Sequence, residues 1–113
     1  MSGKANAVYR VTIEVAPGSE QAWVTWQTKE HIPEVLREPG FLGATFWKDT
    51  ERAADGWARY VVHYRAESVA AVEAYGRSEA AARLRGDHAR RFGTVTRASR
   101  SVLAEPVFIP PPA

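Results

Sequence analysis

The chain has 113 residues, of which 45% are hydrophobic and 25% are charged, a size and composition typical of one globular domain with one core. It contains no cysteine, which excludes disulfides, thiolate zinc sites, iron–sulfur clusters and cysteine nucleophiles. No segment approaches the roughly 20 apolar residues of a membrane helix, and the first residues form no export signal. We therefore expect a cytoplasmic protein that contacts no membrane.

The distribution of charge argues against nucleic acid as a partner. The formal net charge is only +2, and most of the arginines lie between residues 77 and 100. On a helix these arginines would spread around the axis and alternate with Glu79 and Asp87. Because charge of mixed sign weakens the attraction for phosphate, the pattern predicts a solvated helix face.

The first predicted strand spans residues 8–15, where apolar and polar residues alternate strictly. One face carries Tyr9, Val11, Ile13 and Val15, and the other carries Arg10, Thr12 and Glu14. Such alternation is typical of a strand that buries one face.

A helix is predicted to begin after the N-cap Ser19 and to end near residue 30. Pro33 disfavours helical geometry in the residue before it, so we expect a break or kink beside His31 and a short helical turn over 33–38. His31 would then lie at the junction of two helical pieces.

The rest of the chain predicts a hairpin, two helices and a last strand, each bounded by turn or capping residues. These elements span residues 41–48, 57–64, 69–75, 79–92 and 95–103.

The resulting order β-α-β-β-α-β predicts an α+β fold of the ferredoxin-like kind, with a four-stranded antiparallel sheet and both helices on one face. We expect a single domain over 1–113, with an ordered core of about 7–104 and a Pro-rich tail, 105–113. Because the other sheet face needs a cover or water, we expect a homodimer, a dimeric α/β barrel, whose open sheet faces enclose a partly wet cavity. The tail either docks on the partner or frays.

The open face combines polar and aromatic side chains, which suits such a cavity better than a dry core. Alternation assigns to it Arg10, Thr12, Glu14, Thr45, Trp47, Val61, His63, Arg97, Ser99 and Ser101.

Residues 26–36, with the sequence Trp-Gln-Thr-Lys-Glu-His-Ile-Pro-Glu-Val-Leu, followed by 40–42 and Phe46, resemble a bacterial family known only as a domain of unknown function. The segments 60–68 and 84–93 look like its later blocks. The family is similar to the dimeric α/β-barrel group, which includes cofactor-free oxygenases, haem-degrading enzymes, small isomerases, polyketide cyclases and proteins with no known activity. The resemblance implies the fold and fixes little chemistry.

Two histidines are candidates for proton transfer, because an imidazole titrates near neutral pH. His31 at the helix junction could face a cleft, and His63 in the predicted cavity could act with Glu14 or Arg10 on a bound carbonyl compound. The alternatives are that His31 bonds to the kink and that His63 bonds across the dimer.

Aromatic and cationic side chains are candidates for ligand binding. Trp47 and Trp57 could stack on a planar ligand, and Arg10, Arg59 or Arg97 could hold a carboxylate. Plain dimer packing is the alternative for the same residues.

His88 lies on the apolar side of the last helix, which predicts a structural histidine. Haem enzymes of the superfamily take an axial histidine from that region, and Asn6 and Trp57 compare loosely with other groups that such enzymes use, so haem binding stays an alternative. The three histidines lie on separate elements and indicate no metal site. No Gly-rich strand-to-helix turn indicates a nucleotide site, so we expect no cofactor.

The sequence thus predicts a homodimer that binds a small apolar or aromatic metabolite. It could run cofactor-free isomerisation, cyclisation or oxygenation with His31 and His63 as acid and base. The alternative is a non-catalytic domain that stores or senses the ligand, or that interacts with another protein.

Overall fold

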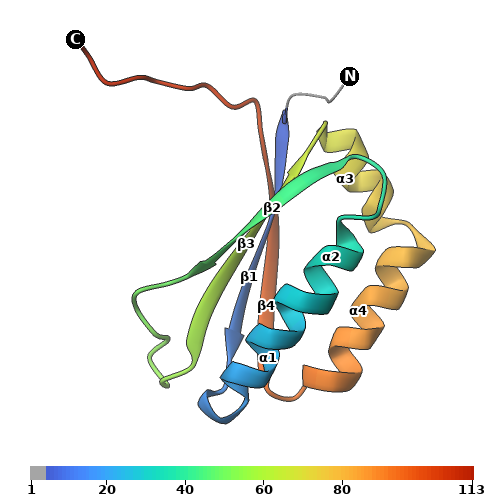
Figure 1. The fold of residues 1–113 in the computed structure, drawn as a ribbon, viewed down its shortest axis with the longest axis vertical. Coiled ribbons are helices and arrows are strands. Elements are labelled where there is room, and N and C mark those ends of the chain that lie inside the picture. Colours follow the sequence, from blue (N-terminus) through green and yellow to red (C-terminus); the bar gives the residue numbers. More distant parts are fainter. Residues whose placement is uncertain (1–4) are drawn as a thin grey trace.

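The structure is a computed structural model that describes residues 5–113 (Figure 1). Its elements are β1 (Ala7–Val15), the 3-10 turn η1 (Pro17–Ser19), α1 (Glu20–Trp26), the π-helical segment η2 (Gln27–His31), α2 (Ile32–Val35), β2 (Phe41–Lys48), β3 (Ala58–Ala66), α3 (Val69–Gly76), α4 (Glu79–Phe92) and β4 (Thr96–Ala104).

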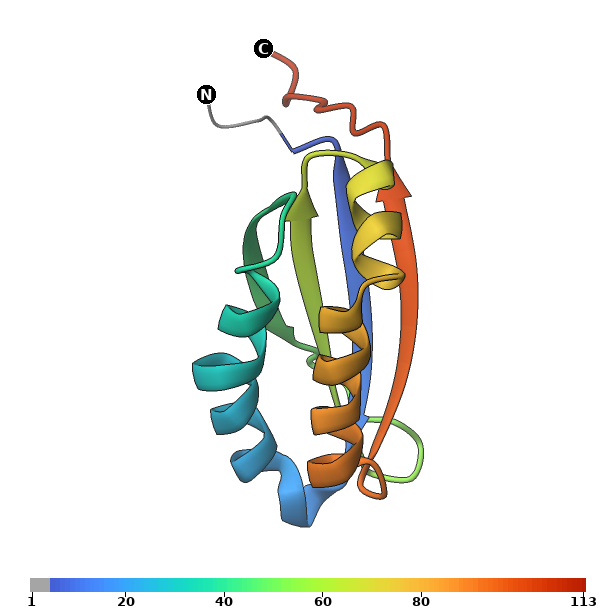
Figure 2. The ribbon, with the colours of Figure 1, turned by 90° about the vertical axis from the view of Figure 1, so that its right-hand side faces the viewer.

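The four strands form one antiparallel sheet with the order β2-β3-β1-β4. All the helices cover the same face of this sheet and leave the other face open (Figure 2). The predicted ferredoxin-like α+β fold is therefore confirmed.

The register of the sheet separates the two faces as the alternation predicts. Tyr9, Val11, Ile13 and Val15 of β1 are at most 9% exposed and face the helices. On the open face, Arg10 pairs with His63 of β3 and with Ser101 of β4. Apolar residues at every second position thus fix which side of each strand is buried.

The core fills the space between this face and the helices. Trp23 of α1 is completely buried, and Leu84 of α4 is 1% exposed. The ring of Phe46 stacks on Tyr60 with the ring centroids 5.2 Å apart. Large aromatic side chains supply much of the apolar area that holds the helices on the sheet.

The predicted break near His31 is absent, because α1, η2 and α2 form one continuous helix (Figure 1). In η2 the N–H of Ile32 donates to the carbonyl of Gln27, five residues back. A proline ring clashes with the carbonyl four residues before it in an α-helix. The wider π turn accommodates Pro33 without ending the helix, and such turns are frequent at functional sites.

The chain beyond β4 leaves the domain as an extended tail (Figure 1). Its apolar side chains Val107, Phe108 and Ile109 are 80%, 85% and 82% exposed. Within residues 5–113, no helix combines the length and the apolar character that crossing a bilayer demands.

Candidate functional site

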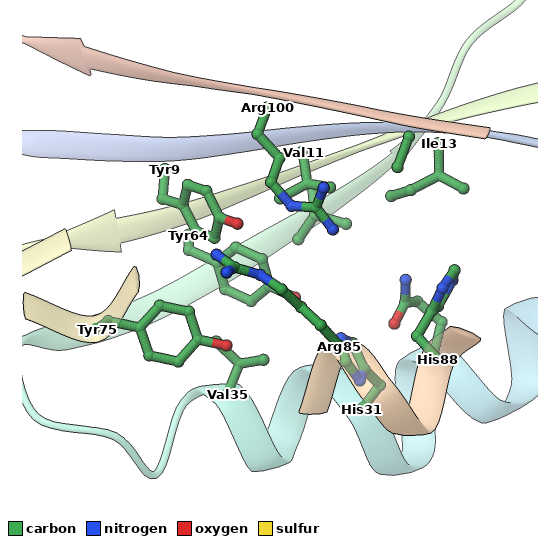
Figure 3. A pocket seen from close by; sticks show the side chains of 13 residues that line it. Tyr9, Val11, Ile13, His31, Val35, Tyr64, Tyr75, Arg85, His88 and Arg100 are labelled. Carbon is green, nitrogen blue, oxygen red and sulfur yellow. The ribbon is translucent and has the colours of Figure 1, made fainter. Parts of the chain in front are cut away.

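A small pocket lies between the sheet and the helices, on the helix-covered side of the sheet (Figure 3). Its volume is about 40 Å³, which is room for about three water molecules. Its lining comes from β1, η2, α2, β3, α3, α4 and β4, and consists of Tyr9, Val11, Ile13, Gln27, His31, Val35, Val62, Tyr64, Tyr75, Arg85, His88, Ala98 and Arg100.

Two imidazoles meet in this pocket. His31 comes from η2 and His88 from α4, and their ring centroids are 5.9 Å apart. Burial, with a smaller effect from the neighbouring His88, lowers the pKa of His31 to about 4. Burial also lowers the pKa of His88, with a smaller effect from the Arg100 charge. Both imidazoles are therefore neutral near pH 7 and able to accept a proton.

The tautomer of His88 is fixed by Trp23. The indole N–H of Trp23 donates to Nε2 of His88 at 3.1 Å. Since an indole nitrogen can only donate, Nε2 carries no proton, and the proton of neutral His88 lies on Nδ1. Trp23 thus leaves His88 with one free donor.

Two buried polar atoms at the pocket have no hydrogen-bond partner within residues 5–113, Oε1 of Gln27 and Nδ1 of His31. Gln27 is only 2% exposed, so bulk water does not serve as its partner. A buried polar atom without a partner costs about 1–3 kcal/mol. A bound molecule that hydrogen-bonds to these atoms would remove this cost.

Phenol groups complete the polar lining. Burial raises the pKa of Tyr75 to about 12 and also raises the pKa of Tyr64. Both phenols are therefore protonated near pH 7 and are neutral donors. In Figure 3 the hydroxyl groups of Tyr9 and Tyr75 point into the pocket.

Of the residues singled out from the sequence as catalytic, the structure places only His31 in this pocket. His63 lies on the open face, opposite Arg10 of β1 and Thr45 of β2. Trp47 also lies on the open face and is 54% exposed. The cavity predicted between two open faces, with His63 as its acid or base, stays a prediction.

Of the remaining predicted ligand-binding residues, Arg10 pairs with His63 in the sheet, whereas Glu14, Arg97 and Trp57 belong to a network of ion pairs and one cation–π contact. Glu14 binds Arg59 and Arg97, each at 3.0 Å. Arg97 also binds Asp55 at 2.8 Å, and its guanidinium lies 4.0 Å from the ring centre of Trp57. Each charge in this network has a partner inside the chain, which leaves Arg97 engaged before any ligand arrives.

Gln27, Arg85 and Arg100 were not predicted from the sequence to belong to the site, and His88 was predicted to be a structural histidine. A signal for Gln27 was present, because Trp23, Gln27 and His31 follow at spacings of four and place two polar groups on the buried side of the helix. Polar residues among buried positions are informative because they need a partner.

The pocket does not fit a haem. Its volume of about 40 Å³ is far smaller than a porphyrin needs, and Nε2 of His88 is occupied by the Trp23 N–H. Across residues 5–113 no cluster of three or more His, Cys, Asp or Glu side chains could hold a metal ion.

Fold and site together define a ferredoxin-like α+β protein with a small polar pocket beneath its helices. A family described as "Domain of unknown function (DUF4286)" matches residues 6–106, and the chain belongs to this family. No curated protein matches the chain significantly.

Solved structures share the fold. A putative antibiotic biosynthesis monooxygenase from Deinococcus radiodurans has a TM-score of 0.69 at 9% identity, covering 95% of this chain and 99% of that one. A monooxygenase from the gene ActVA-Orf6 of Streptomyces coelicolor, in complex with nanaomycin D, has a TM-score of 0.66 at 22% identity, covering 96% and 94%. An EthD family protein from Bacillus halodurans has a TM-score of 0.66 at 12% identity, covering 88% and 98%.

Proposed function

We propose that this protein binds a small carbonyl compound in the helix-side pocket and moves a proton on it without a cofactor, with His31 as the base. The observation that carries the proposal is the pair of unpartnered buried atoms, Oε1 of Gln27 and Nδ1 of His31, beside two neutral imidazoles. A polar pocket with perturbed titratable groups is the usual place for such chemistry.

The step needs no external oxidant. A nitrogen of neutral His31 takes the proton from an acidic C–H beside the carbonyl, and the electron pair of that bond forms the enolate. His88 donates a hydrogen bond from Nδ1, which its bond to Trp23 keeps protonated. Return of the proton from His31 to the enolate oxygen gives the enol and completes a keto–enol isomerisation, whereas its return to the same carbon restores the carbonyl compound. In both cases the imidazole is neutral again.

Structural relatives support a small-molecule pocket of this kind. The Streptomyces coelicolor protein with the same fold is a monooxygenase that was solved with nanaomycin D bound. The pocket described here is much smaller than a polycyclic ligand requires, so we assign to it a smaller carbonyl compound than the aromatic metabolite predicted from the sequence.

Proton exchange in D2O tests the proposal. Small enolisable compounds (butane-2,3-dione, pentane-2,4-dione, pyruvate and 2-oxobutyrate) are incubated with the protein, and loss of the C–H signal is followed by proton NMR. We expect faster exchange than in buffer for at least one compound, and a decrease of roughly a hundredfold in His31→Gln. His63→Gln, which changes a histidine outside the pocket, is the control and should keep the wild-type rate. Equal rates in wild type and His31→Gln would refute the assignment, and binding without exchange would favour a non-catalytic ligand store.

We also propose a homodimer through the open sheet face. Trp47 and Leu103 lie on this face with 54% and 44% of their surfaces exposed, and large exposed apolar groups on one face favour an interface. Light scattering should find a dimer for the wild type and a monomer for Trp47→Glu. Thr50→Glu adds the same charge in the loop after β2 and should stay dimeric. A wild-type monomer would contradict the proposal.

A further inference from the structure

We infer that the pocket selects a small organic anion, whose carboxylate or enolate oxygen lies between Arg85 and Arg100. This inference deepens the proposed function and rests on it for the location of the site. It names the charge and the size of the substrate.

The lining of the pocket has a net positive charge. Of the lining residues, Arg85 and Arg100 are permanently cationic and none is acidic. Neither arginine forms an ion pair with a carboxylate anywhere in residues 5–113, whereas Arg59 and Arg97 on the open face each bind two. The pocket therefore has two uncompensated positive charges, which attract an anion.

The two arginines lie at the mouth of the pocket. Arg85 comes from α4 and Arg100 from the edge strand β4, so they lie on different sides of the pocket, and Figure 3 shows both side chains reaching over it. Both are exposed, which places them at the mouth. Guanidinium groups bind the oxygens of a carboxylate with paired hydrogen bonds. An anion between two positive charges also offsets their mutual repulsion.

The register makes Arg100 an exception within its strand. It pairs with Val11, whose side chain faces the helices, so Arg100 points to the helix-covered side of the sheet. Burial is the main cause of the lowered pKa of both His31 and His88, and the Arg100 charge adds to it in the same direction, whereas Asp87 acts on His31 in the opposite direction. An arginine on this side weakens the base unless an anion offsets its charge. A bound anion would raise the pKa of His31 toward its ordinary range and so strengthen the base where the proton is taken.

The interior of the pocket is uncharged and small. Beyond the mouth, the polar groups are the amide of Gln27, the two imidazoles and phenol groups, which can bond the uncharged end of a ligand. With a volume of about 40 Å³, this interior accepts a short aliphatic group. A short 2-oxo or 3-oxo carboxylate fits this arrangement, because it has an anionic end for the arginines at the mouth and a short uncharged end for the interior.

Matched pairs of ligands test the inference. The imidazole signals of His31 and His88 are followed by 1H–15N NMR during titration with pyruvate and its neutral analogue butane-2,3-dione, and with acetoacetate and pentane-2,4-dione. We expect the carboxylates to shift both imidazoles and to bind at least tenfold more tightly than the neutral compounds. In Arg85→Gln and Arg100→Gln the Kd of the carboxylates should rise at least tenfold, with no change for the neutral compounds. Arg83→Gln, the same change on α4 outside the lining, should bind as the wild type does.

The outcomes separate this inference from the proposed function. Equal or tighter binding of the neutral compounds, or an unchanged Kd in both arginine variants, overturns the anion assignment even where proton exchange is fast. Carboxylate binding that depends on both arginines but gives no exchange in D2O keeps the anion site and refutes the catalytic role. If no carboxylate shifts either imidazole, the inference is wrong.

Discussion

The pH dependence of stability is the sharpest consequence of burying His31. The pKa of this imidazole falls from an ordinary value of 6.5 to about 4 on folding. The unfolded chain therefore binds a proton first as the pH falls. A group whose pKa is lowered in this way favours the folded state only while it is neutral, so stability is complete above about pH 6.5 and decreases as the pH falls toward about 4.

The magnitude follows from the two pKa values. Between about pH 7 and about pH 5, His31 alone should lower the free energy of unfolding by about 2 kcal/mol. His88, whose pKa burial also lowers, adds in the same direction. The carboxylates whose pKa is lowered by hydrogen bonds, Glu20, Asp49 and Asp55, start from 4.5 or below. They act mainly below the window between about pH 5 and about pH 6.5, which the histidines control.

Urea unfolding followed by tryptophan fluorescence at several pH values measures this effect. We expect the wild type to lose stability steadily toward about pH 5 and His31→Gln to lose about 2 kcal/mol less over the same range. The readout is the slope with pH, so a general change in stability of the variant does not matter. A wild type that is equally stable at both pH values, or a His31→Gln slope equal to that of the wild type, would refute the reasoning.

Two further pairs of substitutions test the packing, one at His88 in the pocket and one at two glycines outside it. His88→Phe should lower the free energy of unfolding by about 1–3 kcal/mol, because it leaves the fully buried Trp23 N–H without an acceptor, whereas His88→Gln should cost less; urea titration measures both. Gly40→Ala should destabilise by more than Gly56→Ala. Both glycines have a positive φ, +91° at Gly40 and +90° at Gly56. A Cβ at Gly40 would lie 2.6 Å from Cβ of Ala71, whereas a Cβ at Gly56 would meet no atom within 4 Å. Equal losses would show that only the backbone angle matters.

The elements of the fold could be predicted because their signals are local. Alternation predicted that Tyr9, Val11, Ile13 and Val15 form the buried face of β1, which the structure confirms. The serines before α3 and α4 are N-caps, as their position before a helix predicts. Ser68 accepts the N–H of Ala71 and Ser78 accepts that of Ala81, each at 3.0 Å. Each contact joins two residues within one helical turn, so it can be predicted from the local sequence.

The site could be predicted only in part, because it depends on contacts between distant elements. His31 was selected for its position before Pro33, where a break or kink of the helix was expected; the helix does not break but continues through the π turn. The π turn places five residues where an α-helix has four, and this shift is not visible in the spacing of side chains. The meeting of η2 with His88 of α4 and Arg100 of β4 needs the folded sheet and helices.

The proposed dimer face and the pocket lie on opposite faces of the sheet, whereas the prediction from the sequence placed the ligand cavity within the dimer interface. Every residue that lines the pocket belongs to one copy of the chain, so the second copy is not needed to build it. The open face is then available for association, with Trp47 at its surface and the ion pairs of Glu14 and Arg97 already formed. If this division is correct, the monomeric Trp47→Glu variant should bind carboxylates with the wild-type Kd. A loss of binding that accompanies the loss of the dimer would show instead that the second copy shapes the mouth between Arg85 and Arg100.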